Sequence, residues 1–95
     1  IQAFEFTFEQ SWKATQKVAA DQGVEIANPK NAFSYAMQNK WINQNDEKKW
    51  LNLLKDRNLT TYTYSQDLAQ AILERIQNDY IPMFNELLKN LQKQV

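Results

Sequence analysis

Cysteine and histidine are both absent from the 95 residues of this chain. Their absence excludes disulfides, thiolate nucleophiles, imidazole bases and nearly every kind of zinc site. Catalysis by this chain would have to use carboxylates, arginine, lysine, tyrosine or hydroxyl groups. We predict no metal site, since the sequence also shows no other pattern of metal ligands and no glycine-rich phosphate loop.

Net charge and long apolar runs are missing as well. Eleven Lys and Arg balance eleven Asp and Glu, so the formal charge at pH 7 is zero. Contact with a nucleic acid would therefore be local rather than steered by the whole surface. No apolar run approaches the roughly 20 residues that cross a bilayer, and no basic segment followed by an apolar one opens the chain. We expect a soluble cytoplasmic protein without a membrane partner.

Turn-forming residues are scarce, because the chain has one glycine and two prolines. Apolar residues recur at helical spacing almost throughout, which predicts an all-α protein. A chain of this length forms one domain, here residues 1–95. We expect four antiparallel helices with short connections, in an up-and-down four-helix bundle.

Capping residues indicate where these helices begin and end. Gly23 ends the first helix, and Asn28 with Pro29 starts the second, since proline lacks only an N–H that would have no partner there. Asn45 is expected to cap the third helix, and Pro82 to kink or offset the fourth. The predicted spans are about 1–22, 29–39, from 46 to where helix propensity fails at Thr60, and 66 onward.

Apolar stripes predict which side chains form the core. On the first helix, Phe4, Phe8 and Trp12 share one side whereas Phe6 points to another, so this helix should have two neighbours. Apolar residues follow helical spacing from the first residue of the chain, and we expect a further helix before Ile1. The later residues expected to be buried are Ala32, Phe33, Ala36, Met37, Trp41, Ile42, Trp50, Leu51, Leu53, Leu54, Leu68, Ile72, Ile76, Tyr80, Phe84, Leu87 and Leu91.

A polar stretch near the middle of the chain, KDRNLTTYTY, is the candidate site. An arginine beside an amide and two phenols can bind phosphate and stack on a base. Alternatively, the stretch is only a helix end, where Arg57 compensates the negative end of the dipole and Asn58 and the threonines cap it. The spacing alone leaves both interpretations open. The candidate binding residues are Arg57, Asn58, Thr61, Tyr62 and Tyr64.

Three segments together resemble the nucleotidyltransferase substrate-binding protein family, an all-helical group within the HEPN superfamily. They are AFEFTFEQSWK, NPKNAFSYAMQNKWI and WLNLLKDRNLTTYTYSQDLAQAI, and the resemblance covers essentially the whole chain. Its most specific parts are F-E-x-x-F-E-x-x-W-K at the start and D-R-N-L-T-x-x-T-Y near the middle. The resemblance implies a fold similar to the helical C-terminal domain of aminoglycoside nucleotidyltransferases.

The resemblance also implies a two-component system. This chain would be the substrate- or nucleotide-binding subunit, and a separate minimal nucleotidyltransferase would carry the catalytic carboxylates. The partner would use Mg²⁺ and a nucleoside triphosphate, while this chain would bind no cofactor of its own. We further expect a homodimer within a heteromeric complex, with the regions 57–64 of two protomers facing a shared cleft.

The HEPN superfamily has its own motif, an arginine, a polar residue and a histidine four to six residues after the arginine. Arg57 and Asn58 match its first two positions, but Tyr62 stands where the histidine belongs. A phenol with a pKa near 10 is a poor proton-transfer group at pH 7, so the chain is not expected to be catalytic alone. The alternative is a ribonuclease toxin that binds RNA and is neutralised when its nucleotidyltransferase antitoxin adenylylates Tyr64.

Overall fold

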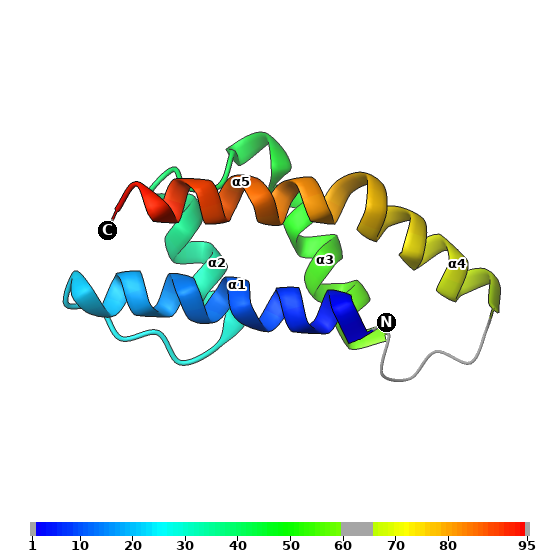
Figure 1. Ribbon diagram of the computed structural model, residues 1–95, viewed down its shortest axis with the longest axis horizontal. Coiled ribbons are helices and arrows are strands. Elements are labelled where there is room, and N and C mark those ends of the chain that lie inside the picture. Colours follow the sequence, from blue (N-terminus) through cyan, green and yellow to red (C-terminus); the bar gives the residue numbers. More distant parts are fainter. Residues whose placement is uncertain (1, 60–65, 95) are drawn as a thin grey trace.

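Four helical stretches make up the computed structural model, which describes residues 2–59 and 66–94 (Figure 1). They contain no strand, so the all-α prediction is confirmed for these residues. α4, a π-helical segment η2 and α5 follow one another without a break and form one long helix. The elements are α1 (Gln2–Asp21), α2 (Pro29–Gln38), the 3₁₀ turn η1 (Gln44–Asp46), α3 (Glu47–Leu59), α4 (Gln66–Arg75), η2 (Ile76–Tyr80) and α5 (Ile81–Gln92).

The helix ends follow the predicted capping residues, with one exception. Gly23 has φ +83° at the end of α1, and the N–H of Val24 donates to the carbonyl of Ala19 at 2.8 Å, which completes a Schellman cap. The side chain of Asn28 accepts a hydrogen bond from the N–H of Asn31 at the start of α2. The exception is the third helix, because Asn43, and not Asn45, caps the η1 turn that leads into it.

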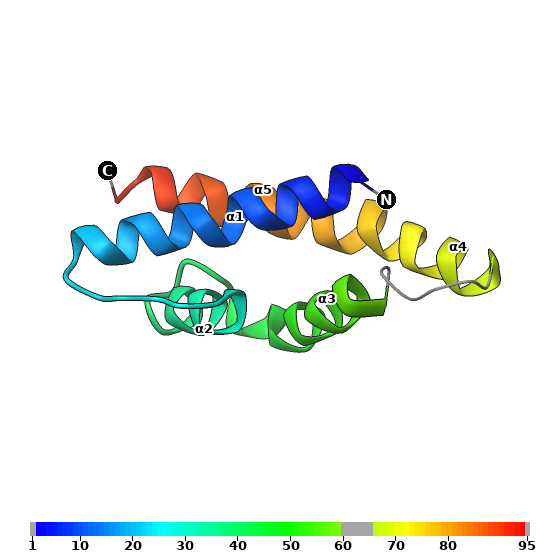
Figure 2. The ribbon, with the colours of Figure 1, turned by 90° about the horizontal axis from the view of Figure 1, so that it is seen from below.

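Two layers of helices are visible in Figures 1 and 2. α1 and α5 lie side by side and run in the same direction, and α2 and α3 form the second layer, running across them. The structure has the four helices that were expected, but they are not all antiparallel, because the two long helices run parallel and the two short ones cross them. α2 carries the chain away from α1 and α3 brings it back, so both long helices run from the same end of a molecule that measures 43 × 23 × 20 Å.

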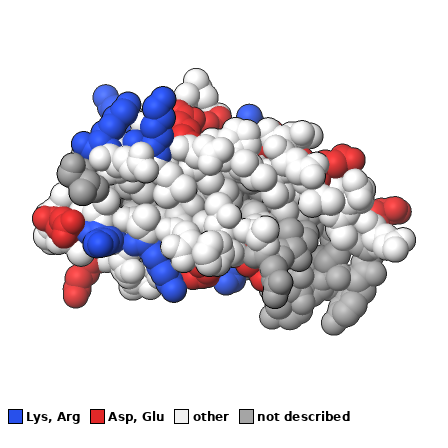
Figure 3. Space-filling model, viewed as in Figure 1, with Lys and Arg blue, Asp and Glu red and all other residues white. Residues whose placement is uncertain are grey.

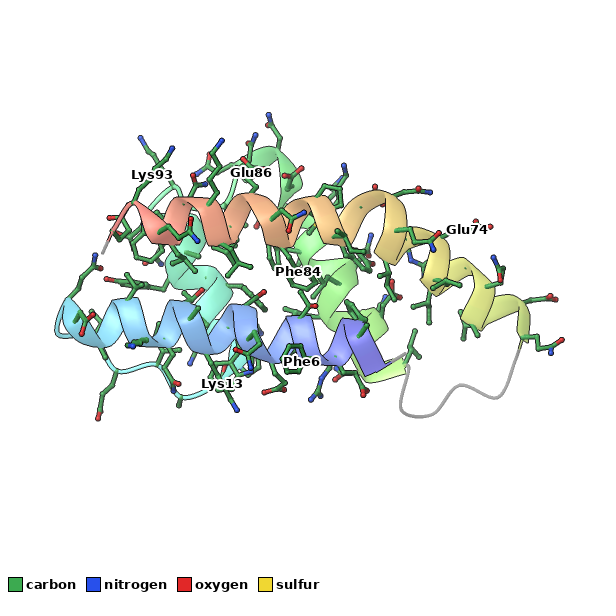
Figure 4. All side chains as sticks on the ribbon, viewed as in Figure 1. Phe6, Lys13, Glu74, Phe84, Glu86 and Lys93 are labelled. Carbon is green, nitrogen blue, oxygen red and sulfur yellow. The ribbon has the colours of Figure 1, made fainter. Side chains whose placement is uncertain are left out.

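Aromatic side chains fill the space between the layers. Trp50 of α3 is the central one, with ring centroids 4.5 Å from Phe33 on α2 and 5.8 Å from Phe84 on α5. Figure 4 shows Phe84 between the two long helices and Phe6 pointing away from α5. Phe6 is 66% exposed, consistent with the prediction that it points away from the main stripe.

Most of the expected core residues are buried, but Leu51 is not. Its exposed fraction is 55%. Because successive residues of an α-helix are about 100° apart, the burial of Trp50 and Leu53 turns Leu51 outward. Leu68 is likewise exposed at the start of the last helix, and Met37 and Leu54 are only half-buried. None of the described helices has the length and apolar character needed to span a membrane.

The predicted irregularity at Pro82 takes the form of the π-helical segment just before it. The N–H of Ile81 donates to the carbonyl of Ile76, five residues back. Pro82 has no N–H to donate to residue 78, and its ring would collide with that carbonyl in a regular α-helix. The wider turn relieves this conflict, and α5 begins directly after it with proline in its first turn.

Candidate functional site

An open groove of about 390 Å³ lies where the last turn of α3 meets the start of α2. α3 contributes the two candidate residues Arg57 and Asn58, so the structure brings these two together in one hollow. The start of α2 supplies polar and cationic groups on the opposite side. The lining residues are Phe8, Asn28, Pro29, Lys30, Leu54, Arg57 and Asn58.

Arg57 is held against α1 by two contacts. Its Nη2 lies 3.5 Å from Oε1 of Glu9, and its guanidinium carbon lies 5.3 Å from the centroid of the Phe8 ring. Glu9 also accepts a hydrogen bond from Nε1 of Trp12 at 3.0 Å, which fixes the carboxylate. The Arg57 side chain is 40% exposed, so an anion in the groove can reach the guanidinium.

The α2 side of the groove adds further positive potential. The N-terminus of a helix carries a partial positive charge from N–H groups without intrahelical partners. Asn28 satisfies one of these N–H groups with its side chain, and the exposed Lys30 adds a full charge beside it. Arg57, Lys30 and the helix end therefore favour an anion, whereas the Glu9 carboxylate opposes one.

The other three candidate residues, Thr61, Tyr62 and Tyr64, lie outside the described residues. The predicted convergence of an arginine, an amide and two phenols is therefore seen only for Arg57 and Asn58. Among residues 2–59 and 66–94, no three residues of the types His, Cys, Asp and Glu are grouped so that they could hold a metal ion.

A second polar cluster lies beside the groove, and the sequence did not reveal it. Asp56 is 3% exposed and is the one buried charged residue in the described part of the chain. Its Oδ2 accepts hydrogen bonds from Nε of Arg75 at 2.7 Å and from the Tyr80 hydroxyl at 2.5 Å, and its Oδ1 accepts one from Nη2 of Arg75 at 2.9 Å. The carboxylate thus has a bidentate arginine and a phenol as partners.

The π-helical segment is what allows Arg75 and Tyr80 to share this carboxylate. Five residues of α-helix rotate by about 500°, which would place the two side chains roughly 140° apart. In a π-helix, with about 4.4 residues per turn, the same five residues leave them only about 50° apart. Both therefore face α3, which contacts η2 directly.

The electrostatics of the cluster follow from burial and charge. Burial and the hydrogen bond to the Asp56 carboxylate raise the pKa of the Tyr80 phenol above its ordinary value. The hydrogen bond to the same carboxylate raises the pKa of Arg75. A signal for Asp56 was present in the sequence, since it follows the buried Leu53 by three residues and so lies near the buried stripe of α3.

The structure is thus a helical domain with an open groove lined by Arg57 and Lys30. A family model described as nucleotidyltransferase substrate binding protein like matches residues 1–93, and the chain belongs to that family. The resemblance carried by the sequence motifs is thereby confirmed, and membership links the chain to a nucleotidyltransferase. Searches of curated proteins and of solved structures gave no match. The similarity in fold to aminoglycoside nucleotidyltransferases stays a prediction.

Proposed function

We propose that this chain is the substrate- or nucleotide-binding subunit of a two-component nucleotidyltransferase and pairs with a separate minimal catalytic subunit. The observation that carries the proposal is the groove in which Arg57, Asn58, Lys30 and the start of α2 converge. Family membership supports the pairing with a nucleotidyltransferase. In this proposal the catalytic subunit supplies Mg²⁺ and the reacting carboxylates.

Each residue of the groove would make a different kind of interaction with a polyphosphate. Arg57 offers a planar guanidinium that can grip two phosphate oxygens at once, and Asn58 can donate from its side-chain amide. Lys30 and the N-terminus of α2 attract the phosphate electrostatically, and this attraction does not require one particular orientation of the phosphate. Glu9 opposes the ligand, because the phosphate has to share Arg57 with this carboxylate. We expect weak binding to the isolated subunit and tighter binding in the complex.

Thr61, Tyr62 and Tyr64 complete the proposed site through their closeness to Arg57 in sequence. Two phenols within seven residues of the guanidinium can stack on a base or donate to phosphate. We also propose that two copies of the chain pair within the complex, since Phe6 and Leu51 are large apolar groups that water contacts. Sedimentation of the protein as a monomer at tens of micromolar would contradict this pairing.

The test of the binding role is a titration with a fluorescent nucleoside triphosphate and Mg²⁺. Arg57→Ala should weaken binding by about tenfold, the effect of losing one charge-assisted hydrogen bond of about 1.5 kcal/mol. The matched control is Lys48→Ala, which removes an exposed charge from the first turn of the same helix. It should change the affinity by less than about twofold, because its charge is screened by solvent.

Two controls keep this test decisive. Circular dichroism has to show that both variants are folded, and the titration is repeated on the complex with the catalytic subunit. Equal losses in Arg57→Ala and Lys48→Ala would mean that only diffuse charge attracts the ligand. In that case Arg57 and Asn58 are a helix end and not a binding site.

A further inference from the structure

Asp56 and Arg57 are neighbours in sequence, yet they connect α3 to two different helices. The Asp56 carboxylate accepts hydrogen bonds from Arg75 and Tyr80 of the last helix, on one side of α3. The Arg57 guanidinium contacts Glu9 and Phe8 of α1, on another side. This divergence follows from the rotation of about 100° between consecutive residues of a helix. The final turn of α3 is therefore held from two directions.

Stability alone does not account for a carboxylate at this position. A buried carboxylate adds little net stability compared with a well-packed apolar residue of similar volume, because the carboxylate loses its hydration even when an arginine pairs with it. The apolar core residues Leu53, Ile72 and Ile76 are buried on the same three elements, so a leucine would be compatible with this environment. What three directed hydrogen bonds add is a fixed rotation of the helix turn that carries them.

We propose that Asp56, Arg75 and Tyr80 are positioning residues that set the orientation of Arg57 and Asn58 in the groove. The inference rests on the proposed function in so far as the oriented groups bind a polyphosphate. Since the π-helical segment brings Arg75 and Tyr80 to one carboxylate, it is part of the same device. Asp56 itself does not touch the ligand.

The test compares Asp56→Asn and Tyr80→Phe with the control Asp79→Asn. Asp79 pairs with Lys49 at 4.0 Å and so also links η2 to α3, but its carboxylate is half-buried and is not enclosed as that of Asp56 is. The control thus removes a carboxylate and an interhelical ion pair without touching the buried cluster. All measurements are made well below the unfolding temperature of each variant.

Two measurements are needed, and the first requires no ligand. Nuclear magnetic resonance signals of the Arg57 Nε–H and of the Asn58 side-chain amide report their surroundings in the free protein. We expect Asp56→Asn to shift both signals clearly, Tyr80→Phe to shift them less, and Asp79→Asn to leave them in place. The second measurement is the affinity for the fluorescent nucleoside triphosphate. The affinity should fall about tenfold in Asp56→Asn, about threefold in Tyr80→Phe and less than about 1.5-fold in Asp79→Asn. Losses of this size are expected when residues that hold the binding groups in place are removed.

The outcomes separate this inference from the proposed function. If Asp56→Asn is folded and changes neither the Arg57 and Asn58 signals nor the affinity, the positioning role is wrong even though the groove binds nucleotide. If the parent protein binds no nucleotide but the signals shift as expected, the proposed function fails and the positioning role holds. If Asp56→Asn does not fold, Tyr80→Phe decides by the same two measurements, because it retains the aromatic ring.

Discussion

Replacing Asp56 by asparagine should destabilise the protein by about 2–3 kcal/mol at pH 7. The substitution keeps the size of the side chain but removes its charge. It also replaces one acceptor oxygen by an NH₂ group, which cannot accept a hydrogen bond from Arg75 or Tyr80. The buried Tyr80 hydroxyl then loses a hydrogen bond to a charged group, which contributes about 1.5–3 kcal/mol. The bond to Arg75 contributes less, at most about 1 kcal/mol, because more than a third of that side chain is exposed to water.

The measurement is urea and thermal unfolding followed by circular dichroism. For a domain of this size each kcal/mol lowers the midpoint temperature by about 4–8 °C, so Asp56→Asn should unfold roughly 10–20 °C below the parent. Tyr80→Phe should cost about 1.5 kcal/mol, the lower end of the range for this hydrogen bond, since it leaves no buried donor without a partner and keeps Asp56 paired with Arg75.

The double variant tests whether the two residues act together. If they share one hydrogen bond, the combined loss should fall short of the sum of the single losses by about 1 kcal/mol. Additive losses would show that the bond between Tyr80 and Asp56 does not contribute. A loss below about 0.5 kcal/mol in Asp56→Asn would refute the reasoning altogether, because a buried carboxylate with three donors cannot be neutralised at so small a cost.

Three further predictions concern pH, affinity and chemistry. The pKa of Tyr80 is higher in the folded state than in the unfolded chain, so the folded state holds the phenol proton more tightly. This stabilises the folded state fully below about pH 10, and the stabilisation is lost as the pH rises further. The stability difference between the parent and Tyr80→Phe should therefore stay constant up to about pH 10 and shrink as the pH rises above it in urea unfolding. A difference that stays constant above that pH would contradict this prediction. Glu9→Gln should raise the affinity for the fluorescent nucleotide about threefold, because it releases Arg57 from a competing carboxylate. Glu5→Gln, at an exposed position on the same helix, is the control. A fall in affinity in Glu9→Gln would mean that Glu9 assists binding of the ligand. The parent should not cleave unstructured RNA with chelator present, whereas Tyr62→His should gain activity; parent cleavage that Arg57→Ala abolishes would favour the ribonuclease alternative.

The electrostatic surface is consistent with a local site rather than a general attraction to polyanions. Figure 3 shows that the middle of the face formed by α1 and α5 carries few charged side chains. Lysines gather near the end of α5, where Figure 4 places Lys93. The candidate groove lies elsewhere, between α2 and α3, with Phe8 as its contribution from α1. Its affinity should therefore depend on Arg57 and Asn58 more than on the charge of the whole molecule.

Helix positions and ends were predictable because they depend on short-range chemistry. Gly23 adopts the positive φ that ends α1, and Asn28 with Pro29 starts α2, each within a few residues of its own signal. The same holds for Arg57 and Asn58, which share the groove because they are adjacent on one helix turn. The sequence by itself thus determined four helices and most of the core, and it was enough to put Arg57 and Asn58 on one helix turn.

Which side of each helix faces which neighbour was decided by the tertiary structure. Leu51 looked like a core residue, but the packing of Trp50 between Phe33 and Phe84 rotates α3 so that Leu51 is exposed. Asp56, Arg75 and Tyr80 are too far apart in sequence to suggest a common site. Their contact requires α3 to pack on η2 and requires a π-helical turn, which changes the direction of every side chain beyond it. Rotation accumulates along a helix, so one wide turn just before Pro82 brings two donors to a buried carboxylate, a contact that local sequence patterns could not reveal.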